Sequence, residues 1–357
     1  MTQSRKLESP STTISQAYSQ HSPISTKRIA ALLSRSKSMP QLQCTTPYLY
    51  KTKDISRSSR PIDYGGESSI YIGSSTVIRG DFVIKCLTCA DEANEKTNIK
   101  TSDSKQIKTK QQCDMEKDLW IKLTEAKARN ILQFHGYYYT KKNFYFIFSK
   151  EEQSLSAYID KQNTPSWQLR YRLMIDITEG IVDIHKNGII HGDIKGGNIL
   201  VNAKMQHPKI CDFGSAHEET DCRRRPLTIE YAAAELFEKT DTPTTKHSDI
   251  FSLAVTFWQI ATWKVVPWDD IPQYAIKSVI QAGITLRLPK YIPAKISNLI
   301  TMCWSQVPSS RPTAVQVLDE LNLISIDELN EADENENQYR LCENAVAENI
   351  EEVRPKM

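Results

Sequence analysis

The sequence predicts an α+β protein in which a sheet-rich part is followed by a helix-rich part. Short runs of β-type residues lie within residues 62–85 and at 143–149, whereas apolar residues recur at helical spacing through much of residues 165–323. Strands that come first and helices that come after are typical of an α+β fold. With 357 residues, 39 % of them hydrophobic, the chain can bury a sizeable core.

Residues 1–60 have the composition of a disordered basic arm. They are rich in Ser and Thr, and they carry ten Lys or Arg against two acidic residues. Such a segment cannot bury enough apolar surface to offset the entropy lost on ordering. Within it, Arg35 precedes Ser38 by three residues and Pro40 follows by two, which resembles the phosphoserine ligands of 14-3-3 adaptors. Ser38 is therefore a candidate site for a phosphoserine-binding adaptor.

The first ordered segment predicts an antiparallel hairpin. SSIYIG (68–73) and DFVIKCL (81–87) have the composition of strands, and IRGD (78–81) forms the turn between them. The residues that follow, about 90–110, are polar and charged throughout, so we expect a flexible insertion there.

The next element is expected to be an amphipathic helix over residues 111–123. Met115, Leu119 and Leu123 recur at four-residue spacing and predict its apolar stripe, with Glu116 on the adjoining face.

The second half of the chain predicts mainly helices. One should begin with Pro165 at its first position and end at Asn187-Gly188, and the apolar stretch 250–263 predicts a buried core helix. Residues 324–357 are mostly acidic and predict a C-terminal tail, with a short helix near its start that packs back on the domain.

The composition favours a reduced, cytoplasmic protein without a membrane anchor. Eight cysteines are scattered along the chain, no secretion signal is present, and the longest apolar stretch is too short to span a bilayer. The arm lacks an aromatic platform for bases, so no nucleic-acid partner is expected. Cys86 and Cys89 have the spacing of half a zinc or redox site, but without a second pair nearby they are expected to be free thiols.

One polar run carries the strongest chemical signal. In IIHGDIKGGNILV (189–201), apolar strands flank Asp193, Lys195 and Asn198, and Asp212 of a CDFG motif follows fourteen residues after Asn198. These motifs in this order resemble the eukaryotic protein kinases. The helical half resembles most closely the tyrosine-kinase-like group of serine/threonine kinases.

The resemblance implies a bilobal protein-kinase fold over residues 61–323, with ATP and Mg²⁺ as cofactors and proteins as substrates. The small lobe would hold an antiparallel sheet and one helix, and the larger lobe would be helical. Asp193 would orient the substrate hydroxyl, and Lys195 would neutralise charge on the transferred phosphoryl group. Asn198 and Asp212 would ligate Mg²⁺.

The same resemblance assigns the nucleotide-binding side chains. Lys85 in FVIK matches the strand lysine that contacts the ATP phosphates, and Glu116 matches the helix glutamate that holds this lysine. Phe148 occupies the gatekeeper position. The remaining residues expected to bind the nucleotide are Ile62, Gly65, Ile70, Val83 and Leu200.

Further positions match the family's structural contacts. Lys195 together with Thr228 is the serine/threonine form of the pattern. Asp249 would tie down the backbone of the catalytic loop, and Arg311 would pair with Glu235. Four residues fall where the family stacks its regulatory spine, although simple core packing is equally compatible with them: Trp120, Phe134, His191 and Phe213.

Two departures from the family pattern bear on activity. The glycine-rich loop aligns with DYGGES, in which Asp63 and Ser68 replace two glycines and only Gly65 is kept, which predicts weakened ATP binding. Gly192 replaces the arginine that usually pairs with a phosphorylated activation segment. An active serine/threonine kinase is the first interpretation, and a pseudokinase scaffold with weak or absent catalysis is the alternative.

Overall fold

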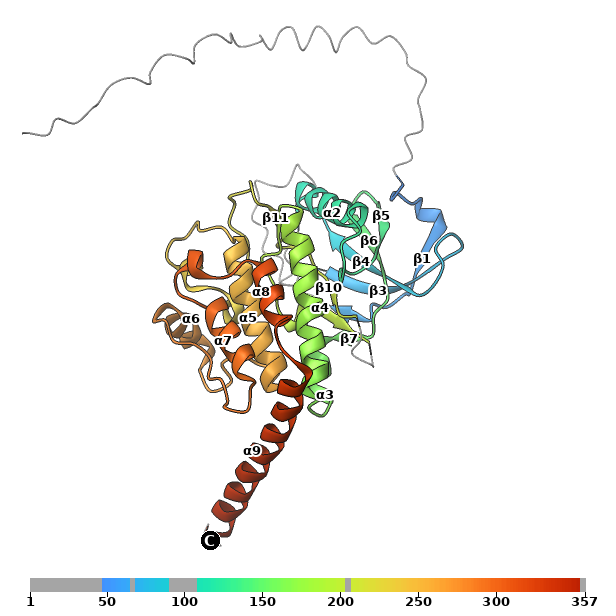
Figure 1. The fold of residues 1–357 in the computed structure, drawn as a ribbon. Coiled ribbons are helices and arrows are strands. Elements are labelled where there is room, and N and C mark those ends of the chain that lie inside the picture. Colours follow the sequence, from blue (N-terminus) through green and yellow to red (C-terminus); the bar gives the residue numbers. More distant parts are fainter. Residues whose placement is uncertain (1–46, 65–67, 90–107, 203–206, 354–357) are drawn as a thin grey trace, which may run out of the picture. The chain divides into compact units, whose positions relative to one another are not determined.

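The computed structural model describes residues 47–64, 68–89, 108–202 and 207–353. The two-lobed α+β architecture expected from the sequence is present, with a β-sheet lobe that carries helix α2 and a lobe built mainly of helices (Figure 1). Ser38, Gly65 and most of the predicted insertion lie outside the described residues. The prediction of a disordered arm up to residue 60 is wrong for its last part, because Ile55–Arg57 pair with β3 (Ser68–Ser75) and Ile55 is buried in a second hydrophobic cluster.

The sheet of the first lobe has six antiparallel strands in the order β1-β3-β4-β6-β5, with β2 paired to β3. The predicted hairpin is confirmed as β3 and β4, and β4 also pairs with the buried strand β6. This pairing places Ile70 opposite Lys85 and Val83 opposite Phe148. The strands are β1 (Ile55–Arg57), β2 (Asp63–Tyr64), β3 (Ser68–Ser75), β4 (Phe82–Thr88), β5 (Phe134–Tyr139) and β6 (Asn143–Ser149).

Helix α2 (Lys110–Glu125) begins with a capping box, in which Thr109 and Gln112 satisfy each other's backbone N–H groups. The predicted apolar stripe is rotated in the structure. Cys113 rather than Met115 is buried, because the face that packs on the sheet also contains Glu116. The buried residues of the helix are Cys113, Glu116, Leu119, Trp120 and Leu123.

The second lobe is built around α5, whose predicted core stretch is buried almost throughout. No helix among the described residues is long and apolar enough to cross a membrane. The helices are α3 (Leu155–Lys161), α4 (Trp167–Lys186), α5 (Lys246–Thr262), α6 (Gln273–Gln281), α7 (Ala294–Cys303), α8 (Ala314–Leu321) and α9 (Ile326–Val353). Five short strands form two small sheets apart from the first, in the orders β10-β9-β7 and β11-β8. They are β7 (Gln153–Ser154), β8 (Ile189–Ile190), β9 (Ile199–Val201), β10 (Lys209–Ile210) and β11 (His217–Glu218).

The start of α4 differs from the prediction. The helix begins at Trp167, so Pro165 lies outside it, and the Trp167 N–H donates to Asp333 Oδ1 of α9 at 2.8 Å. A partner distant in sequence therefore satisfies one of the unpaired N–H groups at this helix start. The predicted end is confirmed, since Lys186 is the last helical residue and Gly188 follows in the left-handed region at φ +69°.

The acidic C-terminal segment forms α9, a helix of 28 residues and thus much longer than the sequence suggested. Its first half packs against α4, and in Figure 1 it runs on beyond the helical lobe in dark red. Arg170 Nη2 of α4 lies 2.5 Å from Glu336 Oε2 of α9, and both side chains are at most 4 % exposed. Arg170 also donates to two backbone carbonyls, those of Pro165 and Ala261. This buried pair anchors α9 to the lobe.

Candidate active site

The loop that contains Asp193 is fixed at both ends by short strand pairs. β8 before it pairs with β11, and β9 after it pairs with β10. A single 3₁₀ turn (Gly196–Asn198) links Lys195 to β9. The loop is therefore held to the rest of the lobe on both sides of its polar residues.

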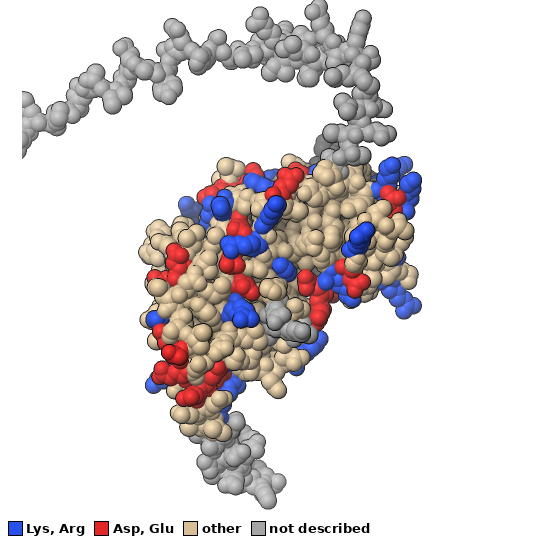
Figure 2. All heavy atoms as spheres, turned by 45° about the vertical axis from the view of Figure 1, so that its right-hand side comes forward, with Lys and Arg blue, Asp and Glu red and all other residues tan. Residues whose placement is uncertain are grey.

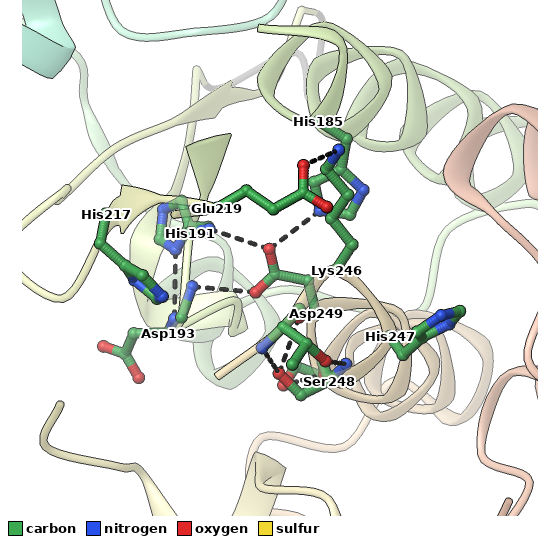
Figure 3. A network of polar contacts seen from close by, with 12 residues as sticks. His185, His191, Asp193, His217, Glu219, Lys246, His247, Ser248 and Asp249 are labelled. Carbon is green, nitrogen blue, oxygen red and sulfur yellow. Dashed lines mark hydrogen bonds and ion pairs between the residues drawn. The ribbon is translucent and has the colours of Figure 1, made fainter. Parts of the chain in front are cut away.

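Asp249 at the start of α5 fixes the backbone of this loop, and its carboxylate lies beside the loop in Figure 3. Its carboxylate accepts the His191 and Gly192 N–H groups at 2.8 and 2.9 Å, and His185 Nε2 lies 2.9 Å from Oδ2. Burial alone would raise the pKa of Asp249, but the hydrogen bond from His185 and these neighbours lower it below its ordinary value. The contact expected between Asp249 and the loop backbone is present.

The Asp193 carboxylate is held by three side chains. Oδ1 accepts a hydrogen bond from Thr228 Oγ1 at 2.6 Å, while Lys195 Nζ and Asn198 Nδ2 lie 2.7 and 2.8 Å from Oδ2. Lys195 also donates to Thr228 Oγ1 at 2.8 Å. The sequence motif and the distant Thr228 thus meet around one carboxylate, which is the arrangement implied for the serine/threonine form.

Lys85 on β4 joins two carboxylates from different parts of the chain. Its Nζ lies 2.9 Å from Glu116 Oε1 on α2 and 2.7 Å from Asp212 Oδ1. Burial opposes the charge on Lys85, but Asp212 and Glu116 raise its pKa above the usual range. Lys85 in turn holds the pKa of Asp212 well below its ordinary value. All three groups are therefore charged at neutral pH.

A second lysine, which the sequence analysis missed, completes this cluster. Lys108 is buried, and its Nζ lies 3.1 Å from Glu116 Oε2, so Glu116 bridges two lysines. Its N–H donates to the Thr88 carbonyl at 3.2 Å, which holds the residue beside the end of β4. Lys108 lies in a polar run without hydrophobic periodicity. The sequence therefore gave no reason to expect that this lysine is buried.

The ion pairs of Glu116 make the free energy of unfolding depend on pH. Burial opposes ionisation of Glu116, but Lys85 and Lys108 lower its pKa below the ordinary value of 4.5. A carboxylate whose pKa is lowered by folding stabilises the protein above its unfolded pKa, and this stabilisation is lost as the pH falls through the folded value. The free energy of unfolding of wild type should therefore exceed that of Glu116→Gln at pH 7, with the gap closing below about pH 4.5. Urea unfolding of both proteins from pH 7 to pH 3 checks this, and a gap independent of pH would contradict it.

Three of the remaining residues predicted to bind the nucleotide lie in the sheet that carries Lys85, namely Ile70, Val83 and Phe148. Phe148 is buried, and Val83 is partly buried against the main core. Leu200 is also partly buried but lies on β9, in a separate sheet. Ile62 is 54 % exposed, and its N–H donates to the Ile70 carbonyl at 2.7 Å.

Four aromatic rings form a continuous stack from the sheet lobe to the catalytic loop. Trp120 lies 6.0 Å from Phe134 and 4.6 Å from Phe213, and Phe213 lies 4.9 Å from His191, measured between ring centroids. The four residues that the resemblance assigned to the regulatory spine therefore lie in contact, as they also would in simple core packing. The stack connects α2, which carries Glu116, to the loop that carries Asp193.

The pairing expected between Glu235 and Arg311 is present. The guanidinium donates to both carboxylate oxygens, at 2.7 and 2.8 Å, and Arg311 is buried. Such bidentate pairs fix orientation as well as charge. The Glu235–Arg311 pair therefore holds the segment after Thr228 against the helical lobe.

Gly192 occupies a position that disfavours a side chain. Its φ is +74°, and an added Cβ would lie 3.0 Å from the Ser215 carbonyl oxygen and 3.1 Å from Thr244 Oγ1. The family usually has an arginine at this position. In this chain the backbone adopts a left-handed conformation, which glycine tolerates better than any residue with a side chain. In the nearby basic run, Arg223 and Arg225 both form salt bridges with Asp221.

Because this arginine is missing, activity should not depend on a phosphate at Thr220, which is exposed. Thr220→Ala should keep wild-type activity within about two-fold, since surface substitutions usually change free energies by less than about 0.5 kcal/mol. The measurement is the initial rate of phosphate transfer to a peptide substrate. An inactive Thr220→Ala protein that regains activity in Thr220→Glu would contradict the prediction.

The family model for the protein kinase domain matches residues 76–321. The chain belongs to the protein kinase family. The match ends at the last residue of α8, so α9 lies outside the matched kinase domain. The residues of the two charged clusters and the Glu235–Arg311 pair lie inside the match, whereas Ile62 and Ile70 precede it.

Curated relatives are kinases of several kinds. The mitogen-activated protein kinase kinase kinase zak-1 of Caenorhabditis elegans is 29 % identical over 229 residues, which are 59 % of this chain and 30 % of zak-1. The serine/threonine/tyrosine-protein kinase HT1 of Arabidopsis thaliana is 31 % identical over 165 residues, 44 % of this chain and 41 % of HT1. The serine/threonine-protein kinase STY17 of the same plant is 24 % identical over 235 residues, 64 % of this chain and 40 % of STY17. The chain thus spans less than half the length of these relatives.

Proposed function

We propose that the chain is an active protein kinase that transfers the γ-phosphate of ATP to Ser and Thr hydroxyls of protein substrates. One observation carries the proposal: all six polar side chains required for this chemistry are present, and they meet in two clusters. Lys85, Glu116 and Asp212 form one cluster. Asp193, Lys195 and Asn198 form the other. Relatives such as STY17, a serine/threonine-protein kinase, support Ser/Thr specificity.

The chain offers oxygen ligands suited to Mg²⁺. The Asp212 side chain is 47 % exposed, and only its Oδ1 contacts Lys85, which leaves Oδ2 for a cation. Asn198 turns its Nδ2 toward both the carbonyl and the carboxylate of Asp193, so its side-chain oxygen points away from them. Carboxylate and amide oxygens are the ligands that Mg²⁺ prefers. When bound, the metal would neutralise charge on the β- and γ-phosphates.

The roles of the protein side chains follow from their contacts. Lys85, kept charged by Asp212 and Glu116, would contact phosphate oxygens as a fixed positive charge. Asp193 would accept a hydrogen bond from a substrate hydroxyl in place of the one from Thr228. Lys195, 2.7 Å from Asp193, would stabilise negative charge between the two reacting groups. Catalysis would therefore consist mainly of positioning and electrostatic stabilisation.

The altered glycine loop bears on affinity for ATP rather than on the chemical step. Asp63 adds a negative charge on the strand that precedes the loop. At about 8 Å and an effective dielectric of about 20 to 80, each repulsion with a phosphate charge costs roughly 0.5 to 2 kcal/mol. We therefore expect a high KM for ATP in an active enzyme.

Two further proposals come from the sequence alone. The scattered cysteines, without a dense disulfide framework, favour action in a reducing compartment such as the cytoplasm. The Ser38 motif suggests that the arm binds a phosphoserine adaptor once it is phosphorylated.

Phosphoamino-acid analysis tests the proposed function. The full chain is incubated with Mg²⁺, γ-labelled ATP and a mixture of protein substrates, and the labelled products are hydrolysed. Phosphoserine and phosphothreonine are expected, and Lys85→Met should remove them. Label found mainly in phosphotyrosine would overturn the proposed specificity, and no label in any product would leave the scaffold interpretation.

A further inference from the structure

Two cysteines from different elements lie next to each other at the edge of the charged cluster. Cys89 directly follows β4, and Cys113 lies in the first turn of α2. Their Sγ atoms are 3.3 Å apart. Cys86, the sequence neighbour of Cys89 in CLTC, packs instead in the second hydrophobic cluster beside Tyr145. Residues three apart on a strand point to opposite faces, so Cys86 and Cys89 are kept apart.

The two thiols differ in access and in acidity. Cys89 is partly exposed, whereas Cys113 is fully buried. A hydrogen bond with Cys113 lowers the pKa of Cys89 below its ordinary value, and the Phe144 N–H and the charge of Lys108 act in the same direction. The same contact and burial raise the pKa of Cys113 above its ordinary value. The pair therefore joins one reachable, more acidic thiol to one sheltered thiol, which is the arrangement of a redox-sensing cysteine beside a resolving one.

We propose that Cys89 and Cys113 form a reversible disulfide that ties β4 to α2 when the protein meets a peroxide. The Cys89 thiolate attacks one peroxide oxygen and the O–O bond breaks, which leaves a sulfenic acid on Cys89. The departing hydroxide takes up the proton that the Cys89 thiol released on ionising and becomes water. Cys113 then loses its proton and attacks Cys89 Sγ, the S–O bond breaks, and the leaving hydroxide takes up that proton as water. In total two thiols are oxidised to one disulfide, and one hydrogen peroxide is reduced to two waters. A dithiol reductant reverses the change by thiol–disulfide exchange.

The disulfide would join the two elements that carry the Lys85–Glu116 ion pair. Cys89 follows Lys85 by four residues, and Cys113 precedes Glu116 by one helical turn. The thiols are adjacent while the ion pair is formed, so the bond is compatible with that arrangement and would hold α2 in it. Closing the gap from 3.3 Å to the ~2.05 Å of a disulfide needs only a small shift. Oxidation is therefore expected to lock the nucleotide cluster rather than to break it.

Peptide mapping of the full chain tests the site itself and does not depend on kinase activity. The reduced protein is treated with hydrogen peroxide at one molar equivalent, alkylated and digested. A peptide that joins Cys89 to Cys113 and disappears on reduction is expected, in wild type and in Cys86→Ser alike, but not in Cys89→Ser. A Cys86–Cys89 bond, or oxidation confined to the exposed Cys222 with Cys89 intact, would overturn the proposal.

Hydrogen exchange of the α2 amides tests the structural consequence. The oxidised wild type should exchange more slowly in the first turns of α2 than the reduced wild type, and peroxide should leave exchange in Cys89→Ser unchanged. Faster exchange after disulfide formation would show that the bond distorts the cluster, against the proposal. Both readouts are independent of phosphate transfer, so the failure of the proposed kinase activity would leave them interpretable.

Discussion

Replacing Asp193 by asparagine is expected to lower the rate of phosphate transfer by about 10²- to 10⁴-fold, the usual contribution of a positioned acid–base group. The substitution keeps the shape of the side chain but removes the charge that Lys195 and Thr228 hold in place. Affinity for ATP should change little, because Asp193 does not contact Lys85 or Glu116. Affinity for Mg²⁺ should also be kept, because the Asp193 backbone carbonyl and the amide oxygen of the new side chain can still accept from Asn198 Nδ2. The loss should therefore appear in kcat and not in nucleotide binding.

Steady-state kinetics and calorimetry on the same protein check both parts of this expectation. Asp160→Asn on α3 is a matched control, because Asp160 is exposed and lies outside both catalytic clusters. It should transfer phosphate at the wild-type rate. If Asp193→Asn were as active as this control, the transfer would not arise at Asp193.

The second large effect is expected at the anchor of α9. Glu336→Ala should lower the free energy of unfolding by about 3 to 5 kcal/mol, because it leaves the buried Arg170 charge without its carboxylate. Glu334→Ala, at an exposed position on the same helix, should change it by less than about 0.5 kcal/mol. Urea unfolding of the full chain, followed by circular dichroism, measures both.

A paired replacement separates the charge from the packing. Arg170→Met with Glu336→Met should be much less destabilised than Glu336→Ala, because replacing a whole buried ion pair by apolar side chains is often neutral or stabilising. Equal losses in the double and single variants would mean that the ion pair is not what makes Glu336 important. A stable Glu336→Ala protein would show that α9 is not part of the folded kinase unit.

The sequence predicted the features that depend on residue type and spacing within one element. The β3–β4 hairpin and the buried α5 followed from period and length, as did the end of α4 at Gly188. The clusters around Asp193 and Lys85 were expected only because ordered motifs resemble a known family, since nothing in the spacing alone brings Lys85 to Asp212.

Other features depend on contacts between distant segments and were therefore missed. Lys108 is buried because the chain returns beside β4 after the insertion, and no local pattern marks that return. The prediction that Met115 is buried was wrong, and Cys113 is buried instead. The buried face of α2 includes Glu116, and hydrophobic periodicity treats a charged residue as exposed. Arg170 and Glu336 are 166 residues apart, and each alone looked like a surface charge.

On the face drawn in Figure 2, acidic and basic side chains are intermixed, as expected when many surface charges have partners of opposite sign nearby. Lys122 pairs with Glu218, and Lys246 pairs with Glu219. Exposed pairs of this kind contribute little to stability. The buried charges of the two clusters and of the α9 anchor are the ones whose removal should have large effects.

The most direct test of the central claim is the rate of Mg²⁺-dependent transfer of γ-phosphate by the wild-type chain beside Lys85→Met and Asp212→Asn prepared in the same way. If the two lysine–carboxylate contacts assemble a working nucleotide site, the wild type should transfer phosphate, each variant should lose nearly all of that activity, and removing Mg²⁺ should abolish it. A wild-type rate no higher than that of either variant would contradict the account.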